Sequence, residues 1–296
     1  MKYHKYLMTF LFNIITIPML LVIQEFIPDK CYTLKDYLLI TLIILIIIIS
    51  GYIEYRKYIL DTKIYLNKNI NKKNQIAKTV LSQVLQLKEY KSYNYCKNTY
   101  EMTINNKEWP YFYNVHDYLN EICLNLKLTI AKIIKTEREY VDVSLIYKYH
   151  NETDWKCLSE KSGISENVQL NDFIADQEVL YNYVLHHKEE LPIFCNDKKK
   201  TTLYKLGKKD NLFDGEGSFY TILITFANNK EILVEAILLI STYGVNFVLT
   251  TLNKKEQDKF REILSFEIMP YYISIIHNEL GALYMRHNLN KIKLLK

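Results

Sequence analysis

Two uncharged apolar stretches lie within the first 53 residues of the chain. They cover residues 7–23 (LMTFLFNIITIPMLLVI) and residues 37–53 (YLLITLIILIIIISGYI). At about 1.5 Å per residue, a helix of either length spans roughly 26 Å, close to the ~30 Å hydrocarbon core of a bilayer. The pattern predicts a transmembrane helical hairpin over residues 1–54, embedded in a lipid bilayer. A signal peptide is the alternative for the first stretch, but no small-residue cleavage site follows it.

The charges that flank these stretches predict their orientation. Six basic residues lie in residues 54–73 against two acidic ones, whereas the loop 24–36 balances two lysines against three acidic residues. Basic residues stay on the cytoplasmic side of a membrane. Both termini are therefore predicted to be cytoplasmic, in a bacterial inner (plasma) membrane.

Three small polar residues share one face of the first stretch. Thr9, Asn13 and Thr16 are spaced four and three residues apart, and on a helix this spacing puts them on one side. An Asn in hydrocarbon needs a hydrogen-bonding neighbour. Two interpretations stay open: a helix interface within the hairpin or between protomers, and a polar stripe that lines a pore built from several copies.

A connector helix is predicted over residues 55–92. This stretch contains no Pro or Gly and consists of good helix formers. Ile76, Val80, Val84 and Leu87 recur at steps of three and four residues and form one apolar stripe. The clean heptads are too few for a long coiled coil. The stripe fits a helix that pairs with its copy in a dimer, or one that packs on the following domain.

Residues 93–296 alternate between helical and strand patterns. Helices are predicted at 115–135, 168–187 and 253–288, and strands at 140–149, 155–161, 191–195, 217–227 and 232–243. Helix, hairpin, helix, strand, hairpin, helix is the order of an α+β domain, with helices packed on an antiparallel sheet. Pro270 is expected to bend the last helix.

This order resembles the GAF family of small-molecule sensors over roughly residues 110–285. The stretches that carry the resemblance are residues 217–220 (GSFY), which enter a strand, and residues 235–244 (EAILLISTYG), which precede the closing helix. The resemblance implies a GAF-like cytoplasmic domain with a ligand pocket beside the last strands. The N-K-x-F-x-D-E signature of cyclic-nucleotide-binding members is absent, so the resemblance does not identify the ligand.

Composition argues against most chemistry. The five cysteines are an odd number without a C-x-x-C pair, which favours isolated thiols over a metal site or disulfide framework. No P-loop, G-x-S-x-G, H-E-x-x-H or kinase signature is present. We therefore expect no catalytic residues, no metal and no cofactor, and we do not expect an enzyme.

One local charge run stands out, in residues 197–210 (DKKKTTLYKLGKKD). Its six lysines are Lys198, Lys199, Lys200, Lys205, Lys208 and Lys209. Beside a GAF-like pocket they would attract phosphates, with Tyr204 or Tyr220 stacking on a base. The alternative is a solvated surface loop, which is what charge runs usually form.

These features together predict a sensor-effector. Its GAF-like domain would bind a small anionic ligand, a nucleotide, and control a pore formed by a membrane homo-oligomer. This architecture resembles membrane effectors of bacterial anti-phage nucleotide-signalling systems, which implies a nucleotide-synthesising enzyme as functional partner. The alternative is a membrane-tethered regulatory scaffold that acts through a separate partner protein.

Overall fold

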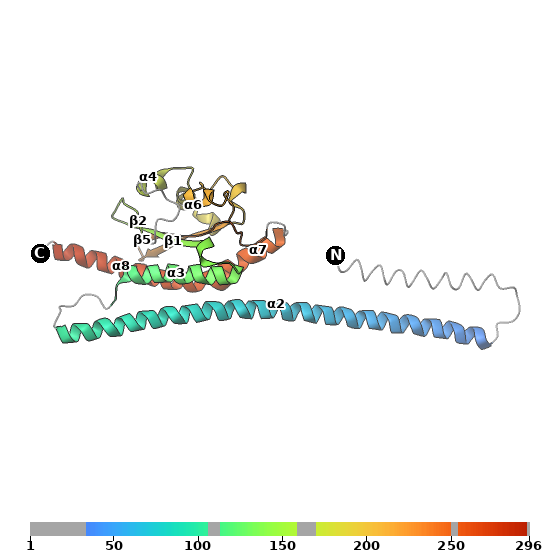
Figure 1. The fold of residues 1–296 in the computed structure, drawn as a ribbon. Coiled ribbons are helices and arrows are strands. Elements are labelled where there is room, and N and C mark those ends of the chain that lie inside the picture. Colours follow the sequence, from blue (N-terminus) through green and yellow to red (C-terminus); the bar gives the residue numbers. More distant parts are fainter. Residues whose placement is uncertain (1–33, 106–112, 159–169, 250–253, 295–296) are drawn as a thin grey trace. The chain divides into compact units, whose positions relative to one another are not determined.

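The computed structural model describes residues 34–105, 113–158, 170–249 and 254–294 (Figure 1). The chain divides into two compact units, Met1–Lys73 and Asn74–Lys296. Helix α2 (Leu34–Asn105) contains the boundary between them. The α+β domain lies in the second unit, together with the last part of α2.

The domain is built on a five-stranded antiparallel sheet with the strand order β2-β1-β5-β4-β3. The strands are β1 (Val141–Tyr149), β2 (Lys156–Cys157), β3 (Ile193–Cys195), β4 (Phe219–Ala227) and β5 (Ile232–Thr242). The central strand β5 pairs with β1 from Val141↔Thr242 to Tyr149↔Val234, and with β4 on its other side. Because β5 is covered on both faces, it reads as an almost continuous apolar run.

Two long helices cover one face of the sheet, and short helices lie over the other (Figure 1). On the first face lie α3 (Val115–Ile134) and α8 (Met269–Leu294), the latter preceded by α7 (Lys254–Glu262) and the π-helical turn η4 (Ile263–Ile268). On the other face lie α4 (Leu170–Ala175), α5 (Leu180–His186) and α6 (Lys208–Asn211). The turn η4 ends just before Pro270, whose missing N–H cannot continue the regular helical ladder.

The last part of α2 is an integral layer of the domain. Ile76, Val80 and Leu87 are buried in the same core as α3 and α8. This apolar stripe therefore packs on the following domain, which is one of the two alternatives for the connector. A buried polar network accompanies it, because Asn125 of α3 donates to the carbonyl and side-chain oxygens of Gln83 at 3.2 and 3.1 Å.

The sequence correctly predicts the α+β class with an antiparallel sheet, but the transmembrane hairpin is wrong. Within the described parts of the chain, no helix combines the length and apolar character needed to cross a membrane. Residues 37–53, predicted as the second span, are the beginning of α2, which continues without interruption through a charged stretch to Asn105. The predicted inner-membrane location with cytoplasmic termini rests on this hairpin and is corrected with it, whereas nothing in the described residues tests the predicted pore.

The predicted first span and its polar face lie outside the described residues. This concerns residues 7–23 with Thr9, Asn13 and Thr16. Their assignment as pore or helix-interface residues stays a prediction.

Candidate functional site

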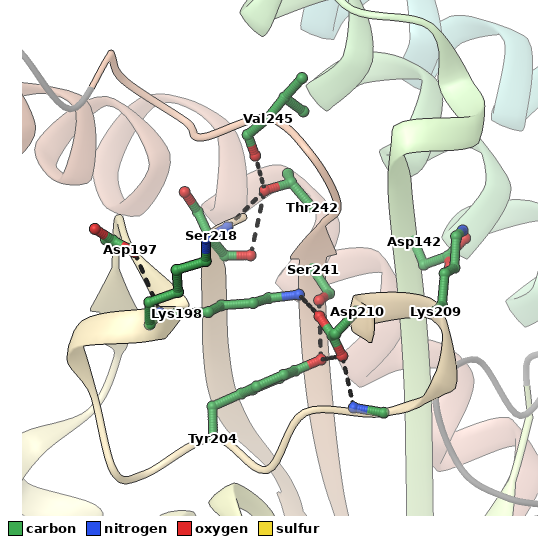
Figure 2. A network of polar contacts seen from close by, with 12 residues as sticks. Asp142, Asp197, Lys198, Tyr204, Lys209, Asp210, Ser218, Ser241, Thr242 and Val245 are labelled. Atoms are coloured by element: carbon green, nitrogen blue, oxygen red, sulfur yellow. Dashed lines mark hydrogen bonds and ion pairs between the residues drawn. The ribbon is translucent and has the colours of Figure 1, made fainter. Parts of the chain in front are cut away.

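The lysine-rich segment crosses one end of the sheet between β3 and β4, with Lys198 turned into the protein (Figure 2). Its ammonium group forms an ion pair with Asp210 at 2.6 Å, and both side chains are fully buried. The second oxygen of Asp210 accepts from the Gly207 N–H at 2.9 Å and from the Tyr204 hydroxyl at 3.3 Å. The charge of Asp210 is therefore fully satisfied from within the segment.

Two aromatic rings complete the surroundings of Lys198. Its ammonium lies 4.5 Å from the ring centre of Tyr204 and 4.2 Å from that of Tyr243. Burial lowers the pKa of Lys198 to about 8, although the charge of Asp210 opposes this shift. The pKa of Tyr204 is raised well above its ordinary value, again mainly by burial. The network ties the segment to the sheet.

Five of the six predicted lysines face carboxylates. Besides Lys198, the pairs are Lys209–Asp142 at 2.6 Å, Lys200–Asp197 at 3.0 Å, Lys205–Asp176 at 3.1 Å and Lys199–Glu216 at 3.5 Å. Lys208 is exposed and forms no ion pair with any described carboxylate. Tyr204 and Tyr220 belong to the cores on opposite faces of the sheet, so the fold does not bring them together. Ligand binding by these residues stays a prediction.

A second place, which the sequence did not indicate, is a polar hollow of about 230 Å³ between α2 and α3. From α2 it is lined by Tyr90, Lys91, Asn94 and Asn98, and from α3 and the residues before it by Tyr113, Asn114, Asp117 and Tyr118. We call it the tyrosine hollow. Its tyrosines, amides and charges come from segments that are adjacent only in the folded chain.

A buried carboxylate of α8 lies beneath the tyrosine hollow. Glu279 is only 3% exposed, and it accepts from the Lys91 ammonium and from the Tyr113 hydroxyl, both at 2.5 Å. The Lys91 side chain is 35% exposed, so one partner of this ion pair is buried and the other reaches solvent. Lys91 also lies 4.4 Å from the Tyr113 ring centre and 5.1 Å from that of Tyr118.

The three tyrosine rings of the hollow pack against one another in two orientations, stacked and edge-on. Tyr90 and Tyr118 are parallel within 9° with centroids 6.3 Å apart, and Tyr113 meets Tyr118 edge-on at 5.9 Å. Burial, followed by the charge of Glu279, raises the pKa of Tyr118 to about 12. Burial and the hydrogen bond to Glu279 raise the pKa of Tyr113 above its ordinary value. Both phenols are therefore neutral at physiological pH.

The rim of the tyrosine hollow carries polar groups with unused hydrogen-bonding capacity. Asn114 caps α3, and its Oδ1 accepts from the His116 N–H at 3.1 Å and from Arg286 at 3.3 Å. Asn94 donates to the carbonyl of its own helix. Among the described residues, the Asn114 Nδ2, the Asn94 Oδ1 and the Asp117 carboxylate take part in no hydrogen bond. They offer one donor and two acceptors around the opening.

An apolar groove of about 410 Å³ lies beside the tyrosine hollow. It is lined by Val84, Lys88, Lys91, Ser92, Tyr95, Tyr118 and Ile275, and thus by residues of α2, α3 and α8. We call it the α2–α8 groove. Lys91 and Tyr118 line both spaces, so these two side chains form the wall between them.

No metal centre accompanies either space, since the described residues contain no group of three or more His, Cys, Asp or Glu side chains able to hold an ion. Comparison with known proteins adds no assignment. No protein-family model matches the chain, and no curated protein matches it.

Proposed function

We propose that the chain is a regulatory protein whose α+β domain binds a small nucleotide in the tyrosine hollow and responds through helix α2. The observation that supports this proposal is the wall of the hollow. There, tyrosine rings and amides surround Lys91, which is paired with the buried Glu279.

The hollow suits the base of such a ligand. Aromatic side chains stack on any nucleobase, at about 1–3 kcal/mol per base, and Tyr90 is both at the rim and 37% exposed. The volume of about 230 Å³ is smaller than the ~300 Å³ at which drug-sized ligand pockets begin. The hollow therefore takes one planar ring system, whose polar edge can bond Asn94, Asn114 and Asp117.

The phosphate of the ligand would lie outside the hollow, close to Lys91. This side chain is partly exposed, and the exposed Lys88 lines the neighbouring groove. A phosphate that pairs with Lys91 competes with Glu279 for the same ammonium group. The anion is therefore recognised at the point where α2 is attached to α8.

Ligand binding would act on α2 because this helix supplies half of the hollow. Two polar contacts hold α2 on the domain: the buried bonds of Gln83 with Asn125, and the partly buried ion pair of Lys91 with Glu279. A ligand that touches α2 and α3 at once favours the position of α2 in which the ligand can contact both helices. The observed order of elements is also the order on which the resemblance to GAF sensors rests.

Calorimetric titration of the full chain with a panel of nucleoside monophosphates and cyclic nucleotides tests the proposal. Tyr90→Ala removes a stacking face and should weaken binding by about 5- to 150-fold. Tyr93→Ala is the matched control, because Tyr93 lies on the same helix, is 68% exposed and does not line the hollow. The proposal fails if no panel member binds, or if both variants weaken binding equally.

A further inference from the structure

The α2–α8 groove is bordered by two helices that run in the same direction. Gln83 of α2 is linked through Asn125 to Tyr272 of α8, and Lys91 is linked to Glu279. Residue numbers therefore rise together along the two helices. The groove lies between these two helices, with Val84 and Lys88 of α2 and Ile275 of α8 in its lining.

Large apolar side chains stand exposed along the groove. Leu81 and Leu85 are 58% and 49% exposed and lie one turn apart on α2. Leu81 lies one turn before Val84 and Leu85 one turn before Lys88, and both of these residues line the groove. On α8, Tyr271 is 54% exposed and lies one turn before Ile275, which lines the groove. A ridge of apolar side chains and an apolar groove thus occupy one surface.

We infer that this surface docks a second copy of the chain, by way of a two-fold symmetric contact between the α2–α8 grooves. A two-fold interface uses the same patch on both subunits, so the patch must be complementary to itself. Here the Leu81–Leu85 ridge of each copy can enter the groove of the other. Ridges that pack into grooves are the usual form of helix pairing.

The charges on this surface are also complementary to themselves. Lys88 lines the groove, whereas Glu89 lies one turn after Leu85 and continues the ridge; both are exposed, and neither forms an ion pair with a described residue. A two-fold contact brings Lys88 of each copy towards Glu89 of the other. A foreign partner would need its own matching acid and base, whereas a second copy supplies both. This inference is independent of the nucleotide proposal.

Sedimentation of the full chain without nucleotide tests the inference. We expect a dimer, and we expect the double variant L81E/L85E to lower the association constant by about 100-fold or more, because four apolar side chains per dimer become charged. L212E is the matched control, since Leu212 is 80% exposed and lies after α6, outside the groove. Circular dichroism confirms that each variant is folded.

A charge exchange separates this arrangement from other modes of association. K88E and E89K should each weaken the dimer, and the double variant K88E/E89K should restore it, because the two charges meet across the axis. A monomeric wild type, an effect of L212E equal to that of L81E/L85E, or a failure of the exchange to restore the dimer overturns the inference.

Discussion

The ion pair that attaches α2 to α8 should respond unequally to removal of its two partners. Glu279 is 3% exposed and Lys91 is 35% exposed. Lys91→Met leaves a buried carboxylate with the Tyr113 hydroxyl as its remaining partner, and an uncompensated buried charge costs about 3–5 kcal/mol. Glu279→Gln keeps an acceptor for Tyr113, while Lys91 can turn to solvent. Its cost should be that of one lost hydrogen bond to a charged group, about 1.5–3 kcal/mol.

Urea unfolding followed by circular dichroism measures these costs. An unchanged slope of the unfolding free energy against urea concentration indicates that two-state behaviour is kept. The double variant K91M/E279Q should cost less than the sum of the single variants, because the second change removes the charge that the first one strands. Hydrogen exchange should locate the loss of protection in residues 76–98 of α2. Equal costs for the two single variants, or strict additivity, would refute the assignment of Glu279 as the buried partner.

Three further predictions concern the core of the domain. The pKa of Lys198 is lowered from 10.5 to about 8, so between these values the unfolded chain holds more protons and the unfolding free energy should rise with pH. Urea titrations at about pH 7.5 and about pH 9.5 should show this gain in the wild type and not in Lys198→Met. Gly217→Ala should lower stability by about 3 kcal/mol or more, because φ is +148° and the new Cβ would lie 2.0 Å from a carbonyl oxygen of β5. Thermal melts measure this loss, and Gly51→Ala, whose new Cβ meets nothing within 4 Å, is the control. Tyr272→Phe removes the donor to Asn125 and should cost about 1–2 kcal/mol in the same assay.

The parts of the fold with strong local patterns could be predicted from the sequence. The expected strands at 217–227 and 232–243 correspond to β4 and β5, and the expected helix at 115–135 corresponds to α3. The expected helix at 168–187 is interrupted instead, and α4 and α5 are its two parts. Asp176 lies in the gap and accepts the Glu178 N–H at 3.0 Å, a local bond that competes with the helical ladder.

The candidate site could not be predicted, because its partners are far apart in the chain. Lys91 and Glu279 are separated by 188 positions and Lys209 and Asp142 by 67, and no local pattern links them. The lysine run stood out as an exposed charge cluster, yet its most buried member is paired with a residue of the same segment. One weak signal for the tyrosine hollow existed, namely an isolated acidic residue at 279 within the apolar side of the last helix.

The two proposed binding surfaces share a wall, and this has an energetic consequence. Lys91 and Tyr118 line both the tyrosine hollow and the α2–α8 groove, and the position of Lys91 depends on Glu279. A phosphate that competes with Glu279 for the Lys91 ammonium changes the wall against which a second copy would pack. Linkage requires the reverse as well: if nucleotide alters the association constant, association alters nucleotide affinity by the same factor. We therefore expect rearrangement of this partly exposed lysine to couple ligand occupancy to assembly.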